Sequence, residues 1–99
     1  MYTKLNSIDE ISDNAIIFKH SNTCSLSARA KDEVNKIAEK ENIFIIIVQE
    51  NRELSNKIEE VYKIKHESPQ FIIIRNNEPQ SVLNHLEITE EKIEKLLKI

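Results

Sequence analysis

The chain has 99 residues, of which 39% are hydrophobic and 31% charged, and its formal net charge is -3. This length accommodates one hydrophobic core, so we expect residues 1–99 to form a single domain. The slight acidic excess argues against a nucleic-acid-binding protein, which would carry an excess of basic residues to pair with phosphates. The sequence contains no glycine, and this excludes the glycine-rich phosphate-binding loops of nucleotide-dependent enzymes.

The cysteine count and the apolar runs predict a cellular compartment. A single cysteine cannot form a disulfide within the chain, as small secreted domains do. The longest apolar run covers residues 43–48, whereas a membrane-spanning helix needs about 20 apolar residues. Residues 1–5 also lack the charged and apolar segments of a signal peptide. We therefore expect a cytoplasmic protein that does not enter the membrane.

The first half of the chain predicts a short helix, a strand and a long helix. Ser7 and Glu10 have the spacing of a capping box, which predicts a helix over residues 8–13. Residues 15–18 are all apolar, and a run this short and rich in β-branched residues indicates a buried strand. A helix of about four turns is predicted next, because apolar residues recur at helical spacing. These residues are Leu26, Ala30, Val34, Ile37 and Ala38.

The second half predicts three more strands and two more helices. Residues 43–48 and 71–74 are apolar at every position, which is typical of strands covered on both faces. Asn76 and Asn77 predict a hairpin turn, and residues 81–86 the returning edge strand. Asn51 and Thr89 are the expected N-caps of the two helices. The apolar residues of these helices are Leu54, Ile58, Val61 and Tyr62 in one and Ile93, Leu96 and Leu97 in the other.

The order of these elements predicts an α/β fold. Strands that are apolar on both faces require helices on both sides of the sheet. A βαβ unit followed by a ββα unit is the thioredoxin-like core. A right-handed crossover places the second strand beside the first. The third strand then runs antiparallel on the other side of the first, which gives a four-stranded mixed sheet of order 2-1-3-4.

Cys24 is the candidate reactive residue, because it falls where the first strand has ended and the long helix begins. The unpaired N–H groups and positive dipole at a helix start favour a thiolate over a thiol. The alternative is a small buried hydrophobic residue, but the neighbouring residues are polar. Ser27 occupies the place of a second cysteine in a Cys-x-x-Cys motif, so any redox cycle must use one thiol. Ser27 would hydrogen-bond to Cys24 or be an ordinary helical serine.

The Ser68-Pro69 peptide bond is the second candidate feature. In a thioredoxin-like core the loop before the third strand lies beside the cysteine. A cis bond would turn the backbone of Ser68 toward a bound thiol ligand, which it would pair with like a short added strand. Only about 5–6% of X-Pro bonds are cis in folded proteins, so trans is the general expectation.

Three histidines complete the inventory of side chains that could carry chemistry. His66 and His85 are expected in loops or at the surface, whereas His20 precedes Cys24 by four residues and would favour its thiolate. The spacing of these residues matches no closed zinc site, so we expect no metal. A Cys–His hydrolase would also need an oxyanion hole, for which loops without glycine offer no obvious donors.

Three separated segments of the chain carry a resemblance to a known family. They are Phe18-Lys19-His20-Ser21-x-Thr23-Cys24-x-Leu26-Ser27, Asn51-Arg52-x-x-Ser55-Asn56 and His66-Glu67-Ser68-Pro69-Gln70. With these segments in this order, the sequence resembles the monothiol bacilliredoxins of the bacillithiol system, YtxJ type, over nearly its whole length. The resemblance implies a thioredoxin-like protein whose reactive cysteine is Cys24 and whose cis-proline is Pro69. Ser25 stands where the family usually has proline, and Asn77 where it tends to have glycine.

The resemblance also implies an activity. Cys24 would remove bacillithiol from mixed disulfides on cytosolic proteins, with bacillithiol as co-substrate and no bound cofactor. Thr23, Ser25 and the backbone of Ser68 would position the ligand, with His20 as an electrostatic helper. The alternative is a thioredoxin-fold adaptor module in which Cys24 does no chemistry. Neither alternative involves nucleic acid or a membrane.

Overall fold

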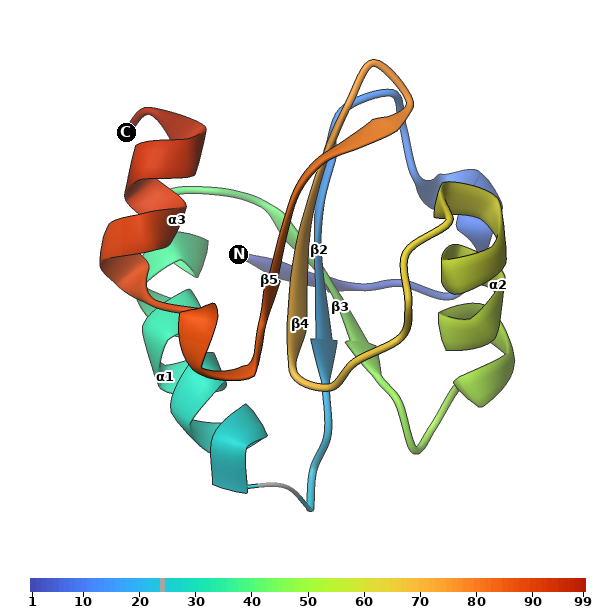
Figure 1. Ribbon diagram of the computed structural model, residues 1–99, viewed down its shortest axis with the longest axis horizontal. Helices are drawn as coiled ribbons and strands as arrows, with labels where there is room; N and C mark the ends of the chain where they lie inside the picture. The colour runs from blue at the N-terminus through green and yellow to red at the C-terminus, as the bar shows by residue number, and fades with distance from the viewer. Residues whose placement is uncertain (24) are drawn as a thin grey trace.

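A five-stranded mixed sheet runs through the middle of the molecule, with helices on both of its faces (Figure 1). The computed structural model describes residues 1–23 and 25–99. The strand order is β1-β3-β2-β4-β5, and the architecture is the α/β arrangement expected from the sequence. The strands are β1 (Tyr2–Lys4), β2 (Ala15–His20), β3 (Ile43–Ile47), β4 (Gln70–Arg75) and β5 (Glu78–Asn84).

Strand β2 lies at the centre of the sheet. It is parallel to β3 and antiparallel to β4, so that Phe18 lies opposite Ile45 on one side and Phe71 on the other. All six residues of β2 are buried, because elements cover both faces and both edges of the strand. Strand β5 pairs antiparallel with β4 at the edge of the sheet. The predicted order of the four longer strands is therefore confirmed.

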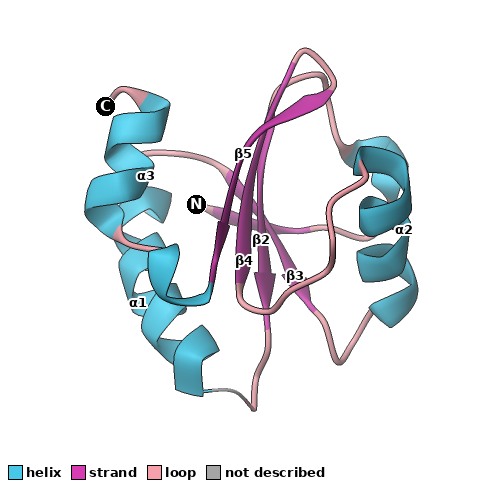
Figure 2. Cartoon of the chain, in the orientation of Figure 1, coloured by secondary structure: helices cyan, strands magenta, loops and turns pink. Residues whose placement is uncertain are grey.

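The three α-helices divide between the two faces of the sheet. Helices α1 (Ser25–Ala38) and α3 (Glu90–Leu97) cover one face and α2 (Arg52–Tyr62) covers the other (Figures 1 and 2). The core under α1 and α3 contains Phe18, Val34 and Phe71. The core under α2 contains Ile17 and Ile58. Alternate residues of β2 thus point into different cores, as the pleat of a strand requires.

The predicted apolar stripe of α1 is wrong at its first member. Leu26 is 39% exposed, whereas the side chain of Ser27 is fully buried. Ala30 and Val34 are buried as expected. Leu26 precedes Ala30 by four residues and Ser27 precedes it by three, so either could lie on the same helix face as Ala30. The sequence analysis chose Leu26 because it is apolar. The structure instead buries a polar hydroxyl at the start of this helix.

The N-terminal segment differs from the prediction in two ways. Residues 2–4 form a fifth strand, β1, parallel to β3 with Tyr2 opposite Ile43. The sequence did not indicate this strand, because it has only three residues and two of them, Thr3 and Lys4, are polar and exposed. The helix predicted over residues 8–13 is the single 3₁₀ turn η1 (Ile8–Glu10). Its capping box is present, with the Glu10 carboxylate accepting the Ser7 N–H at 2.8 Å.

The remaining caps and turns follow the sequence closely. The side chains of Asn51 and Thr89 accept backbone N–H groups at the starts of α2 and α3, as predicted. Asn76 and Asn77 have φ values of 54° and 65°, the left-handed conformation that a tight hairpin requires. The returning strand is β5, which begins earlier than expected and ends at the 3₁₀ turn η2 (His85–Glu87). Among the described residues, no helix is long and apolar enough to cross a membrane.

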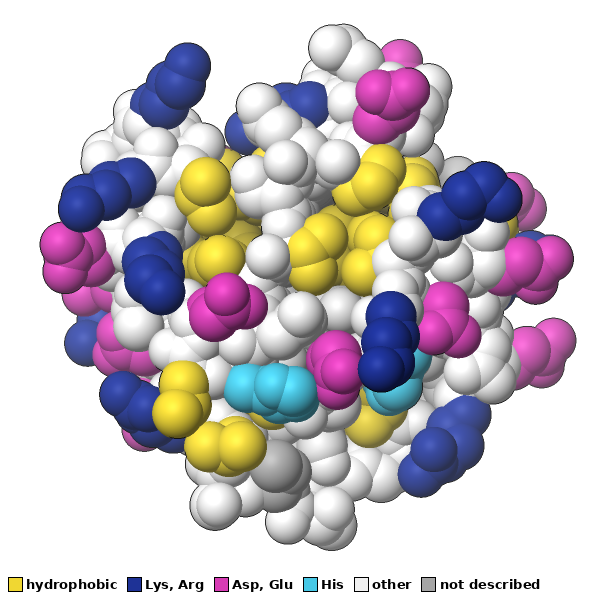
Figure 3. Space-filling model, viewed as in Figure 1, with side chains coloured by type: hydrophobic (Ala, Val, Ile, Leu, Met, Phe, Trp, Pro, Cys, Tyr) yellow, Lys and Arg dark blue, Asp and Glu magenta, His cyan; other side chains and the backbone are white. Residues whose placement is uncertain are grey.

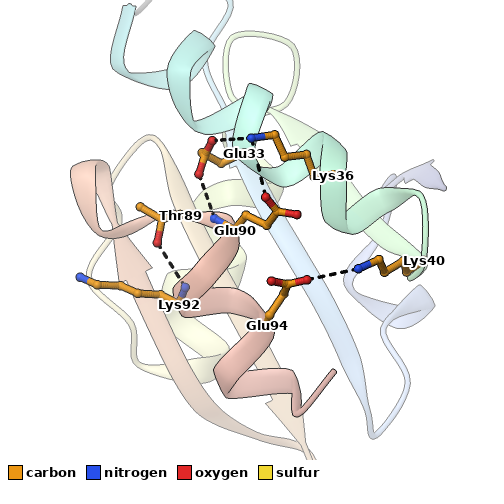
Figure 4. Close-up of polar contacts among 7 residues, drawn as sticks. All are labelled: Glu33, Lys36, Lys40, Thr89, Glu90, Lys92 and Glu94. Carbon is orange, nitrogen blue, oxygen red and sulfur yellow. Dashed lines mark hydrogen bonds and ion pairs between the residues drawn. The ribbon is translucent and has the colours of Figure 1, made fainter.

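Polar contacts attach α3 to α1 (Figure 4). The Glu33 carboxylate accepts the backbone N–H of Glu90 at 3.0 Å, at the positive end of α3. Lys36 lies 3.2 Å from Glu33 and 3.7 Å from Glu90, so it bridges the two helices. The pair of Lys40 and Glu94, 3.2 Å apart, lies one turn farther along. These exposed pairs orient α3, while the buried Ile93 supplies apolar packing.

Candidate functional site

The loop after β2 is held in place by a residue from the loop after β3. The Nε2 group of Gln49 donates to the hydroxyl oxygen of Ser21 at 2.6 Å and to that of Thr23 at 3.0 Å. The Oε1 atom of Gln49 accepts the Asn22 N–H at 3.2 Å. One amide side chain thus contacts three consecutive residues. The sequence analysis did not single out Gln49, because only the parallel pairing of β2 and β3 brings the two loops together.

Helix α1 begins with one exposed and one buried candidate residue. Ser25 is its first residue and is exposed, as is Thr23 before it. The buried hydroxyl of Ser27 accepts the Ser21 N–H at 3.2 Å. Ser27 therefore connects the helix to the preceding loop. Cys24 lies outside the described residues.

His20 ends β2 and faces the core under α1. The side chain is 7% exposed, and its ring centroid lies 5.6 Å from that of Phe18. Burial lowers the pKa of His20 below its usual 6.5, and the positive charge of Lys31 lowers it further, while a backbone hydrogen bond at Ser27 opposes both. At neutral pH the ring is uncharged. The expected effect of His20 on the Cys24 thiolate stays a prediction, because Cys24 lies outside the described residues.

The loop between α2 and β4 contains a cis peptide bond at Ser68-Pro69, as the resemblance implies. Pro69 is buried, and its carbonyl oxygen accepts the backbone N–H of His85 at 3.0 Å. This bond connects the loop to η2. Glu67 lies 3.4 Å from the ring of His85, and Figure 3 shows histidine and acidic side chains next to one another on this face.

A buried lysine occupies the opposite face of β2 from His20. The side chain of Lys19 is fully buried, with Nζ 3.1 Å from the carbonyl oxygen of Ser55 in α2 and 3.3 Å from Nδ1 of His66. The Ser55 hydroxyl lies 3.0 Å from the same ring nitrogen. The sequence analysis expected His66 in a loop or at the surface and did not assign a role to Lys19. A lysine beside an apolar run is usually exposed, so the sequence alone does not reveal this cluster.

Gln70 connects this cluster to the edge strand. Its Nε2 group donates to the carbonyl oxygen of Lys65 at 3.0 Å and to the side chain of Asn84 at 2.9 Å. Among the described residues, the buried side-chain atoms without a hydrogen-bond partner are Nδ1 of His20, Oγ of Ser68 and Oε1 of Gln70. Such atoms are rare in folded proteins and call for a physical explanation. All three belong to segments at the carboxyl end of β2, where open α/β sheets bind ligands.

The described side chains form no cluster suited to a metal ion. Within residues 1–23 and 25–99, no group of three or more His, Asp or Glu side chains is placed to hold one. The chemistry that the described residues support is hydrogen bonding of a ligand at the carboxyl end of β2.

A family comparison identifies the class of protein. The model of the monothiol bacilliredoxin BrxC family matches residues 2–93, nearly the whole chain. The chain belongs to the monothiol bacilliredoxin family. This membership supports a function of the thiol oxidoreductase type.

Solved structures show the same fold. A protein described as an oxidoreductase with a thioredoxin fold is 32% identical, with a TM-score of 0.85, covering 95% of this chain and 91% of that one. A variant thioredoxin from Halobacterium salinarum is 16% identical with a TM-score of 0.75, covering 99% and 87%. Reduced Schistosoma mansoni thioredoxin is also 16% identical, with a TM-score of 0.71 and coverage of 98% and 95%. The fold is therefore thioredoxin-like.

The three segments that carry the bacilliredoxin resemblance meet in space. Lys19 belongs to the first segment, Ser55 to the second, and His66 and Gln70 to the third. Lys19, Ser55 and His66 contact one another, and Gln70 lies opposite Lys19 in the antiparallel pair of β2 and β4. One residue from each segment thus takes part in a polar cluster of Lys19, Ser55 and His66 on the α2 side of the sheet.

Proposed function

We propose that the protein removes bacillithiol from mixed disulfides on protein cysteines, as a bacilliredoxin of the YtxJ type, with Cys24 as its reactive thiol. The observation that carries this proposal is the family match over residues 2–93. The sequence supplies the one thiol that the reaction needs, because Cys24 is the only cysteine of the chain. An intermediate with a disulfide inside the chain is therefore excluded.

The proposed reaction consists of two thiol–disulfide exchanges. The Cys24 thiolate attacks the bacillithiol sulfur of the protein–bacillithiol disulfide, and the protein cysteine leaves as a thiolate that takes up a proton. Cys24 then carries bacillithiol in a mixed disulfide. The thiolate of a second bacillithiol attacks the bacillithiol sulfur of this adduct and releases the Cys24 thiolate and bacillithiol disulfide. The two steps together convert the protein–bacillithiol disulfide and one free bacillithiol into the protein thiol and bacillithiol disulfide, so the free bacillithiol is the reductant.

The ligand would be positioned by residues on both sides of the site. The exposed hydroxyls of Thr23 and Ser25 can hydrogen-bond to it. The backbone of Ser68 would pair with it like a short added strand. Ser27 and His20 contribute indirectly in this proposal. Ser27 holds the preceding loop through Ser21, and His20 offers an uncharged ring whose Nδ1 has no partner among the described residues.

The proposed macromolecular partners are bacillithiolated proteins of the cytoplasm, with no nucleic acid or membrane involved. Leu26 in α1 is 39% exposed and Leu86 in η2 is 58% exposed, and α1 packs beside η2. Exposed apolar side chains on two elements that pack together favour contact with another protein. No bound cofactor is required, because bacillithiol enters as co-substrate.

Intact-mass spectrometry tests this proposal directly. The reduced protein is incubated with bacillithiol disulfide, and the mass is recorded before and after addition of excess bacillithiol. We expect one bacillithiol per chain, lost again when bacillithiol is supplied. Cys24→Ser should gain no mass, and Lys57→Met, at an exposed position of α2, is the control that keeps the thiol and should gain mass as wild type does. A wild-type protein that remains unmodified would contradict the proposal and favour the adaptor alternative.

A further inference from the structure

The buried lysine of β2 has no part in the exchange reaction described above. The ammonium group of Lys19 is fully buried, and a buried charge is unfavourable unless it is paired or hydrogen-bonded. Its two partners come from different elements. One is the carbonyl oxygen of Ser55 in α2, and the other is Nδ1 of His66 in the loop between α2 and β4. Lys19 therefore connects the central strand to both.

The chemistry of these groups determines their protonation. A lysine ammonium only donates hydrogen bonds, so Nδ1 of His66 must be unprotonated to accept one. The ring proton then lies on Nε2. The backbone N–H of His66 donates to the Glu59 carboxylate at 2.7 Å. His66 is thus held by its ring to β2 and by its backbone to α2, and it precedes Ser68 by two residues.

We propose that Lys19 is a positioning residue, whose ammonium acts through His66 to hold residues 66–69 against α2 and so fixes Ser68 for pairing with the thiol ligand. The proposal rests on the proposed function, in which the Ser68 backbone binds the ligand. Lys19 touches no reacting atom in this account. Its removal should therefore weaken substrate binding more than it slows the chemical step.

The surrounding charges define the pH range in which this contact exists. Burial lowers the pKa of Lys19 to about 8, although the Glu59 carboxylate opposes this change. Burial and Lys19 lower the pKa of His66 below its usual 6.5, with Arg52 adding to this effect and Glu59 and Glu67 opposing it. A charged lysine beside a neutral histidine is therefore the stable pair at neutral pH. Above about pH 8 Lys19 loses its proton, and the loop should be held less firmly.

Lys19→Met is the first test, because methionine keeps an unbranched side chain in the cavity without the charge. We expect KM for a bacillithiolated protein to rise about tenfold with kcat changed much less. Lys57→Met, at an exposed position of α2, is the matched control and should leave KM unchanged. The ratio of wild-type to Lys19→Met activity should fall as the pH rises through about 8. A ratio that is independent of pH, or an unchanged KM, would overturn the proposal.

A double-mutant cycle tests whether Lys19 acts through His66. His66→Phe keeps a ring of similar size without Nδ1. The double variant Lys19→Met/His66→Phe should have a KM no higher than that of the worse single variant, because both changes break the same contact. Additive effects on KM would show that Lys19 acts by another route. If Lys19→Met does not fold, the KM and pH profile of His66→Phe decide the question.

Amide hydrogen exchange provides a readout that does not depend on the enzymatic activity. In Lys19→Met the His66 amide should exchange faster, while the amides of α1 and α3 keep wild-type protection. Unchanged exchange at His66 would overturn the proposed positioning role. If wild-type protein does not demodify the substrate, the proposed function fails, and the exchange measurement alone decides the role of Lys19.

Discussion

Two buried polar side chains determine how the carboxyl end of β2 is organised. Lys19 lies on the α2 side of the sheet and contacts Ser55 and His66, while Ser27 lies on the α1 side and contacts Ser21. The sequence analysis placed Ser27 in the site but left its partner open, and it did not assign Lys19 a role. The sequence analysis missed both buried contacts because serine and lysine are mostly exposed in folded proteins.

The buried ammonium of Lys19 makes stability depend on pH. The pKa of Lys19 is about 8 in the folded protein and 10.5 in a free side chain. The folded state therefore loses this proton first, and wild-type stability should rise between pH 8 and 10.5, with the cost of burying the charge fully present below pH 8. Lys19→Met lacks both this cost and the hydrogen bonds of the ammonium. The unfolding free energy of Lys19→Met minus that of wild type should therefore decrease as the pH rises through this range.

Urea denaturation of both proteins at several pH values from 7 to about 10 measures this difference. Taking the difference between the two proteins cancels the titration of other groups, including Tyr2, whose pKa burial raises to about 12. A difference in unfolding free energy that stays constant or grows with pH would contradict the account of Lys19.

Ser27→Ala should destabilise the protein by about 1–3 kcal/mol, because it leaves the buried Ser21 N–H without its acceptor. Ser25→Ala, on the exposed side of the same helix, is the control and should change stability by no more than about 0.5 kcal/mol. Thermal unfolding followed by circular dichroism measures both. Equal losses in the two variants would show that the Ser21–Ser27 hydrogen bond does not stabilise the loop.

At the scale of elements, periodicity and capping residues predicted the long helices and the buried strands. The fully apolar runs of β2, β3 and β4 could be recognised because both faces of these strands are covered. Strand β1 could not, since Tyr2–Lys4 is short and two of its residues are exposed. The start of β5 was also misplaced. Pro79 lies inside this strand, opposite Ile74 of β4 and beside an irregularity in the pairing, whereas proline is usually found at the start or the edge of a strand.

The hairpin between β4 and β5 depends on two residues with positive φ. Asn77→Val should destabilise the protein by about 1–2 kcal/mol, because a β-branched residue is disfavoured at a φ of 65°. Asn77→Gly should match or slightly exceed wild type, because glycine adopts this conformation without steric cost. Urea unfolding midpoints compare the three proteins. A midpoint for Asn77→Val equal to that of Asn77→Gly would contradict the turn assignment.

At the scale of the whole molecule, chain topology brings the candidate site together. The parallel crossover from β2 to β3 sets Gln49 against Ser21 and Thr23. The antiparallel return through β4 sets Gln70 opposite Lys19. The sequence predicted this topology and the cis bond at Ser68-Pro69, the latter through the family resemblance. It could not predict the hydrogen bonds between segments, because these depend on packing distances that no local pattern encodes.

The central claim is that the single thiol of the chain performs the exchange. The most direct measurement is demodification of a bacillithiolated protein by wild type and Cys24→Ser, side by side, with bacillithiol present. The account predicts release of the target thiol by wild type and only the uncatalysed rate with Cys24→Ser, whose chain contains no other cysteine. Equal rates from the two folded proteins would contradict it.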